Sequence, residues 1–302
     1  MNIIQTSDLT KKFGNKLAVN NLNLEVPEGS IFGFLGENGA GKSTTLKMLT
    51  GLTYPTSGDY TIFGLNARNQ RVDIAKKIGV LIETPGFLPF LTGRQQLQQL
   101  ARLKGNSSKD EIDELLNLVR IEYAADRKIK TYSTGMKQRL GLAQALLGDP
   151  ELILLDEPFS GLDVKGVIEI KSLLTHLNKT NNITIFLSSH RLRDIEQICT
   201  HAMVIKNGSQ VTQGTIDELL PSKKLVSIEV SNVEATKDKL LKMNIQFEVK
   251  DGAWIRVHLD TITRKQLVDE LVSTGINVYY LSEDEKMSLE DFYLNQTKEI
   301  IV

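Results

Sequence analysis

A glycine-rich stretch near the N-terminus has the residue types that bind phosphate. Gly36 is followed after four residues by Gly41, Lys42 and Ser43, in the pattern G-x-x-x-x-G-K-S. Glycines let successive backbone N–H groups face a phosphate, the lysine adds a mobile positive charge, and the serine hydroxyl can bind Mg²⁺. An apolar run at 31–35 and a helix-like segment flank the pattern, as such a loop requires. The following residues are expected to contact a nucleoside triphosphate: Gly36, Glu37, Asn38, Gly39, Ala40, Gly41, Lys42, Ser43 and Thr44.

A second apolar run ends in two acidic residues. The run at 152–155 leads into Asp156 and Glu157. We expect Asp156 to lie beside Ser43 and to hold Mg²⁺ with it, while Glu157 polarises the attacking water. On its own this run could be an ordinary buried strand with a polar end. Its combination with the phosphate loop favours the catalytic interpretation.

The stretch YSTGMKQR at 132–139 precedes an apolar, helix-like segment. Here the chain resembles the ATP-binding-cassette (ABC) family, whose signature reads roughly LSGGQ before the same kind of helix. The chain keeps Ser133 and Gly135 and departs from the signature at its first glycine and its glutamine. A serine and a glycine at a helix start offer hydroxyl and N–H donors to an anion, although an ordinary helix cap is the alternative. The resemblance implies that Ser133 and Gly135 contact ATP bound by the other subunit of a dimer.

Three further segments resemble the family in order and spacing. SGLD at 160–163 resembles the loop that packs across the dimer. His190 resembles the switch histidine that contacts the γ-phosphate, so we expect it to be catalytic together with Glu157 and Lys42. Phe13 resembles the aromatic residue that stacks on adenine. An aromatic side chain suits this role, because every base offers a π-face on which it can stack. Taken singly, His190 could be a buried structural histidine and Phe13 a core residue.

One position departs from the family pattern. Glu83 stands where the family usually has a glutamine that touches Mg²⁺ and the attacking water and senses the membrane partner. A carboxylate can still bind a cation, but it cannot donate a hydrogen bond, and it adds negative charge near the γ-phosphate. We therefore expect Glu83 to be a metal ligand with Ser43 and Asp156. The segment IETPGF at 82–87 resembles the corresponding segment of the bacitracin and lantibiotic self-protection transporters and their multidrug relatives.

The elements that position these residues follow from the apolar runs. Runs at 152–156 and 183–189, separated by a helix-like segment, indicate a parallel sheet covered on both faces. Leucines at helical spacing predict a mainly helical insert at about 85–147. Further strands are expected at 2–9, 17–26, 59–63 and 78–82, and a hairpin at 201–215 that turns at Asn207-Gly208. The resemblance implies an α/β fold of the P-loop NTPase, ABC type, with a mixed sheet and an antiparallel β edge.

The character of the chain changes beyond Pro221. The pattern reads β-α-β-β-α-β, with a last helix at 288–300, and resembles a small ferredoxin-like α+β appendage. We therefore predict two domains. The first is an ATP-binding domain at 1–220, and the second is an accessory domain at 221–302.

Composition restricts the partners. The 302 residues include 36 basic and 37 acidic ones, so the net charge of −1 offers no general attraction to nucleic acid or to anionic lipid. The single cysteine, Cys199, excludes an internal disulfide and a cysteine-based zinc site. The sequence has neither a signal peptide pattern nor an apolar stretch of roughly 18 residues, so we expect no transmembrane helix.

The resemblance implies an ATP-hydrolysing subunit of a membrane exporter for a peptide antibiotic, lantibiotic or drug-like compound, with ATP and Mg²⁺ as cofactors. Having one phosphate loop and one signature, the chain would form a homodimer or pair with a sibling ATPase. It would act on integral-membrane permease subunits at the cytoplasmic face of the cell membrane, without nucleic acid. The alternative is a soluble, non-transport ABC ATPase acting in translation or DNA repair. A small-molecule kinase fits less well, because such an enzyme has no use for YSTGMKQR.

Overall fold

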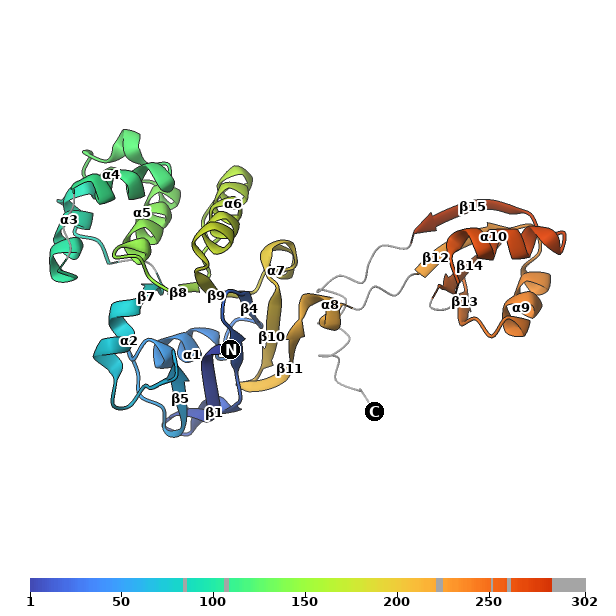
Figure 1. The fold of residues 1–302 in the computed structure, drawn as a ribbon, viewed down its shortest axis with the longest axis horizontal. Coiled ribbons are helices and arrows are strands. Elements are labelled where there is room, and N and C mark those ends of the chain that lie inside the picture. The colour runs from blue at the N-terminus through green and yellow to red at the C-terminus, as the bar shows by residue number, and fades with distance from the viewer. Residues whose placement is uncertain (84–85, 106–108, 221–224, 251, 260–261, 284–302) are drawn as a thin grey trace. The chain divides into compact units, whose positions relative to one another are not determined.

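The computed structural model describes residues 1–83, 86–105, 109–220, 225–250, 252–259 and 262–283. Contacts divide the chain into two compact units, Met1–Ile216 and Asp217–Val302. In Figure 1 the first unit runs from blue to yellow and the second from orange to red. Among the described residues, no helix has both the length and the apolar character that crossing a bilayer requires.

A six-stranded mixed sheet forms the centre of the first unit, with the order β11-β10-β4-β9-β8-β7. Neighbours from β10 to β7 are parallel, and β11 returns antiparallel to β10 through the predicted hairpin at Asn207-Gly208. Every residue of β4, β8 and β9 is buried, which explains why these strands read as continuous apolar runs. The strands span β4 Ile31–Leu35, β7 Ile78–Leu81, β8 Leu152–Asp156, β9 Thr184–Ser189, β10 His201–Lys206 and β11 Ser209–Thr215.

A second, antiparallel sheet lies in the same unit, with the order β2-β1-β5-β6 and with β3 also paired to β1. The expectation of one strand over 17–26 was wrong, because the Thr6 hydroxyl breaks the run by donating to Leu22 O and accepting from Leu24 N–H. Strand β1 is longer than predicted and carries Phe13 at its end. The strands span β1 Asn2–Phe13, β2 Lys16–Leu22, β3 Glu25–Pro27, β5 Ser57–Ile62 and β6 Leu65–Asn66.

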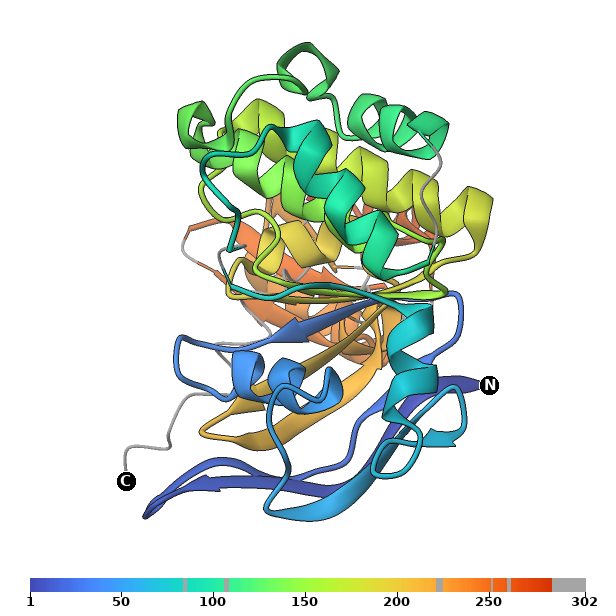
Figure 2. The same ribbon diagram turned by 90° about the vertical axis from the view of Figure 1, so that its left-hand side faces the viewer.

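Helices cover both faces of the central sheet. Figures 1 and 2 show α3–α6 on one side and α1, α2 and the antiparallel sheet on the other. Between Gly93 and Leu146 the described residues form mainly helices, as predicted for the insert, and Thr92 forms an isolated β-bridge with Lys128. The helices span α1 Lys42–Leu49, α2 Arg71–Lys77, α3 Gly93–Leu103, α4 Lys109–Leu118, α5 Thr134–Leu146, α6 Val164–Asn181, α7 Leu192–Ile198 and α8 Ile216–Leu219, with 3₁₀ turns at Glu122–Ala124 and Ile129–Thr131.

The second unit contains an antiparallel sheet with the order β13-β14-β12-β15 and a separate apolar core that includes Ile228, Ile255 and Leu267. Side chains of Asn232 and Thr263 cap its two helices. The helix predicted at 288–300 lies outside the described residues. The elements span β12 Leu225–Val230, α9 Val233–Lys242, β13 Phe247–Val249, β14 Trp254–His258, α10 Arg264–Ser273 and β15 Val278–Glu283.

Candidate nucleotide-binding site

The glycine-rich loop connects β4 to α1, and its tight path requires glycine at two positions. A Cβ at Gly36 would lie 2.5 Å from Ile205 O, and one at Gly41 would lie 2.6 Å from Ala18 O. Gly41 also has a φ of 110°, a conformation that other residues rarely adopt. The neighbouring strands thus press the loop into a close curve at the start of α1, where backbone N–H groups favour an anion.

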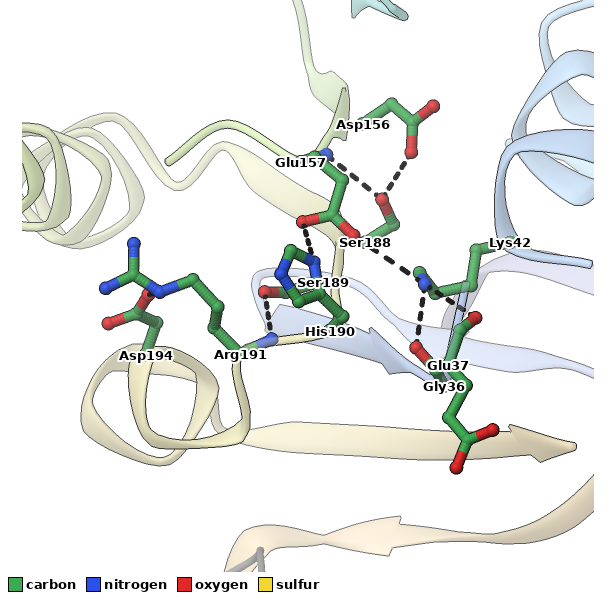
Figure 3. A network of polar contacts seen from close by, with 10 residues as sticks. All are labelled: Gly36, Glu37, Lys42, Asp156, Glu157, Ser188, Ser189, His190, Arg191 and Asp194. Atoms are coloured by element: carbon green, nitrogen blue, oxygen red, sulfur yellow. Dashed lines mark hydrogen bonds and ion pairs between the residues drawn. The ribbon is translucent and has the colours of Figure 1, made fainter. Parts of the chain in front are cut away.

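Lys42 holds the loop closed from inside. Its side chain is only 6% exposed, and Nζ donates to Gly36 O at 2.7 Å and to Glu37 O at 3.1 Å. Figure 3 shows the ammonium group pointing back at these carbonyl oxygens. The ammonium group of Lys42, which is predicted to bind phosphate, therefore lies inside the loop.

A cleft of about 290 Å³ opens over the loop and brings together residues that are far apart in the sequence. Phe13, at the end of β1, forms one part of its wall, and Glu157, after β8, forms another. Lys16 and Ala18 were not predicted to line the cleft. The short turn that joins β1 to β2 was the sequence feature that could have indicated them. Gly36, Glu37 and Ala40 are not in the lining, which consists of Phe13, Lys16, Ala18, Asn38, Gly39, Gly41, Lys42, Ser43, Thr44 and Glu157.

A larger cavity of about 540 Å³ lies where β8 and β9 begin, at the opposite edge of the sheet. Its apolar part includes Leu115 and Leu177. Its charged lining residues are all acidic: Glu28, Glu111, Glu114, Asp149 and Glu151. Because like charges repel, this cavity does not suit a triphosphate.

The two acidic residues at the end of β8 both contact Ser188 of the neighbouring strand β9. Ser188 Oγ donates to Asp156 Oδ1 at 2.5 Å and accepts from the Glu157 N–H at 3.1 Å (Figure 3). Glu157 has a φ of 47°, so the chain turns sharply between the two acids. Sequence reasoning missed Ser188, although two serines ending an apolar run were a signal that a hydroxyl is needed there.

Glu157 lies between two predicted catalytic residues. Its Oε1 is 3.6 Å from Lys42 Nζ, and its Oε2 is 3.0 Å from His190 Nδ1. His190 follows β9 directly, and Figure 3 shows its ring turned toward the Glu157 carboxylate. The structure thus brings together Lys42, Glu157 and His190, and this arrangement can orient a carboxylate as a general base.

The residues predicted to bind metal have suitable donors. Ser43, which carries a hydroxyl group, lines the cleft, and the buried Asp156 ends β8. Mg²⁺ prefers oxygen ligands and commonly uses one or two carboxylates together with substrate phosphates. Within the described residues, no group of three or more His, Cys, Asp or Glu side chains is placed to hold a metal ion.

Glu83 has a lysine partner in the structure. It follows β7 with a φ of 57°, and its Oε1 lies 2.5 Å from Nζ of Lys47 on α1. Sequence reasoning did not single out Lys47, because an exposed lysine on a helix carries no signal by itself. Metal ligation by Glu83 stays a prediction.

Ser133 and Gly135 are not among the residues that line the cleft. Ser133 caps α5, with its hydroxyl accepting from the Met136 N–H at 3.2 Å. The signature stretch packs against the 160–163 loop, because a Cβ at Gly161 would lie 2.7 Å from the Thr134 side chain. The exposed Ser133 hydroxyl and this loop therefore form a separate surface of the chain.

Comparison with known proteins identifies the family of this chain. The ABC transporter family model matches residues 19–160. The bacitracin transport ATP-binding protein BcrA of Bacillus licheniformis is 40% identical over 97% of this chain and 96% of its own length. The protein of the same name from Enterococcus faecalis is 39% identical, over 96% of this chain and 95% of its own length.

Solved structures show the same fold. A dimeric ATP-binding cassette in a post-hydrolysis state, bound to ADP and Pi, matches with a TM-score of 0.66 and 26% identity, over 70% of this chain and 98% of its own. The predicted α/β cassette fold is confirmed by this likeness. Since a relative 40% identical spans nearly its full length, the chain belongs to the ABC transporter ATP-binding proteins.

Proposed function

We propose that this chain is the ATPase subunit of an exporter that removes a peptide antibiotic such as bacitracin, a lantibiotic or a drug-like compound from the cell. The observation that carries the hydrolytic role is the position of Glu157 between Lys42 and His190. The cargo class is supported by the two relatives named for bacitracin transport. Separate integral-membrane permease subunits would carry the cargo.

The predicted site residues have distinct roles in this proposal. The loop N–H groups and Lys42 bind the phosphates, and Phe13 stacks on adenine. Ser43 and Asp156 would hold Mg²⁺, which would supply positive charge beside the phosphates. Glu157 accepts a proton from the attacking water, and His190 orients the Glu157 carboxylate and reaches the γ-phosphate.

The site is completed by a second subunit. Ser133 lies outside the lining of its own chain's cleft, with an exposed hydroxyl at the start of α5. We assign Ser133 and Gly135 to the γ-phosphate bound by the partner, in a homodimer or in a heterodimer with a sibling ATPase. The dimeric form of the similar cassette supports this assembly. Closure on ATP and reopening after hydrolysis would drive the permease, which holds the dimer on the cytoplasmic face of the membrane.

Replacing Glu157 by Gln tests the hydrolytic role. The amide keeps the size of the side chain but cannot act as a base, so ATP turnover should fall by at least about 100-fold. Binding of ATP, measured by calorimetry, should be largely kept. Glu151→Gln is the matched control, because this exposed acid lies just before the same strand, at its other end. Near-normal turnover in Glu157→Gln would remove Glu157 from its role.

A non-transport ABC ATPase is the competing function, and the two differ in their partners. The exporter ATPase should co-purify from detergent-solubilised membranes with a multi-helix membrane protein. Ribosomal RNA in its place would contradict the export proposal. The chain's net charge of −1 favours the membrane-protein partner, because it offers no general attraction to nucleic acid.

A further inference from the structure

An ion pair lies at the same edge of the sheet as the nucleotide cleft. Lys47 Nζ and Glu83 Oε1 are 2.5 Å apart. Lys47 is on α1, four residues after Ser43, so both side chains project from one face of that helix. Glu83 follows β7, which is parallel to β8, the strand that ends at Asp156. The pair therefore lies close to the residues proposed to hold Mg²⁺.

The two lysines of α1 are each paired with one of the acidic residues at the ends of β7 and β8. Three acidic residues lie at these strand ends: Asp156 ends β8, Glu157 comes directly after it, and Glu83 follows β7. Glu157 lies 3.6 Å from Lys42, Glu83 is paired with Lys47, and Asp156 accepts a hydrogen bond from Ser188. A triphosphate entering this edge would meet repulsion from any carboxylate that had no cation beside it.

We propose that Lys47 is the counter-charge of Glu83, a positioning residue that holds this carboxylate away from the γ-phosphate until Mg²⁺ competes for it. The inference rests on the proposed function, because it assumes ATP and Mg²⁺ at the loop. A glutamine at position 83 would carry no charge and would need no such partner. Lys47 and Glu83 are 37% and 61% exposed, so their pair adds little to folding stability. Its effect is on the electrostatics of the site.

Nucleotide binding to the full chain, with and without metal, tests this role. The non-hydrolysable analogue AMP-PNP is titrated by calorimetry in Mg²⁺ and in EDTA. In Lys47→Met, Glu83 has lost its lysine partner, so its carboxylate is free to bind Mg²⁺. When metal is absent, the negative charge of Glu83 is no longer balanced by Lys47 and repels the nucleotide. The preference for the Mg²⁺ complex should therefore rise about three- to tenfold, the scale of one partly exposed charge pair. Lys47→Arg keeps the charge and should match the unmodified chain.

A double-mutant cycle separates this role from a general loss of positive charge. In the Glu83→Gln background, Lys47→Met should change the Mg²⁺ preference by about twofold or less, because the carboxylate it balances is gone. An equal rise in both backgrounds would overturn the proposal. So would an unchanged preference in Lys47→Met itself.

Lys77 provides a matched control. Its Nζ lies 2.9 Å from Glu151 Oε1, and the two side chains are 45% and 56% exposed, so this pair resembles the Lys47–Glu83 pair in distance and exposure. It lies where β7 and β8 begin, at the far edge of the sheet. Lys77→Met should leave the Mg²⁺ preference unchanged, and a shift as large as that of Lys47→Met would overturn the proposal. If AMP-PNP does not bind the unmodified chain, the proposed function fails as well.

Discussion

Each carboxylate oxygen of Glu157 has a side-chain nitrogen close to it. Lys42 lies 3.6 Å from one oxygen and His190 lies 3.0 Å from the other. Lys42 also donates to two loop carbonyls, so a phosphate entering the loop would offer it a charged acceptor in their place. That exchange would weaken the hold of Lys42 on Glu157. Arrival of ATP would then free one carboxylate oxygen for the attacking water.

Ser188→Ala should weaken both folding and hydrolysis. The hydroxyl is fully buried and serves Asp156 and the Glu157 N–H at once, so its removal leaves two groups without this partner. The free energy of unfolding should fall by about 1–3 kcal/mol, as for a lost buried hydrogen bond. Turnover should fall about tenfold, because both acids lose their positioning. Denaturant unfolding and steady-state ATPase assays measure the two effects.

Ser30→Ala is the control for Ser188→Ala. Ser30 is also buried, and its hydroxyl donates to Pro27 O at 2.5 Å, just before β4 and away from the cleft. It should cost a similar free energy of unfolding but leave turnover close to normal at a temperature where both variants are folded. Equal losses of turnover would show that Ser188 acts through stability alone.

At the scale of elements, the strands that are buried on both faces were predictable, because such burial leaves a continuous apolar run in the sequence. β4, β8 and β9 are buried on both faces, and each appears as an apolar run that ends at a site residue or loop. The order of the strands was not predictable, because β9 separates β4 from β8 and periodicity carries no information about neighbours. The break between β2 and β3 was missed because it depends on the hydroxyl of Thr6, from another strand. The Lys47–Glu83 pair was not predictable either, because its two residues are 36 positions apart in the sequence and meet only in the folded chain.

An ion pair between helices α5 and α6 should make folding stability depend on pH. Arg139 of α5 lies 2.5 Å from Glu169 of α6, and Arg120 also contacts Glu169. The hydrogen bond from Arg139 lowers the pKa of Glu169 below its ordinary value of 4.5. The folded state therefore binds this proton less readily than the unfolded state. The resulting stability is present above pH 4.5 and is lost as the pH falls through the lowered pKa.

Comparing Glu169→Gln with the unmodified chain isolates this contribution. Thermal melts should show the variant to be less stable near neutral pH, with the difference shrinking as the pH falls to about 3. Glu234→Gln is the control, because that acid is 80% exposed and pairs with Lys237 of the same helix, α9. A difference for Glu169→Gln that stays constant with pH would contradict the assignment to Glu169 ionisation.

At the scale of the whole molecule, the proposed catalytic parts all fall within one unit. The phosphate loop, Asp156, Glu157 and His190 belong to Met1–Ile216, while Asp217–Val302 has its own apolar core. A domain folds on its own core, so the two units should separate without loss of structure. The division into an ATP-binding domain at 1–220 and an accessory domain at 221–302 stays a prediction, and the boundary between the two units falls four residues earlier, after Ile216.

Ending the chain after residue 220 tests that division. The shortened chain should remain folded by circular dichroism and should bind AMP-PNP with nearly the affinity of the full chain, because the cleft is intact. A folded fragment that no longer binds nucleotide would show that the accessory domain takes part in the site. A fragment that does not fold would show that the two units depend on each other.

The backbone at Glu157 and Glu83 has an evolutionary consequence. Both residues adopt positive φ, 47° and 57°, which costs free energy for any residue with a Cβ. Glycine would relieve that strain at either position, but it would also delete the carboxylate. Folding stability and the proposed chemistry of the site therefore favour different residues at these two positions, so we expect selection for heat resistance alone to remove the acids before it changes the fold.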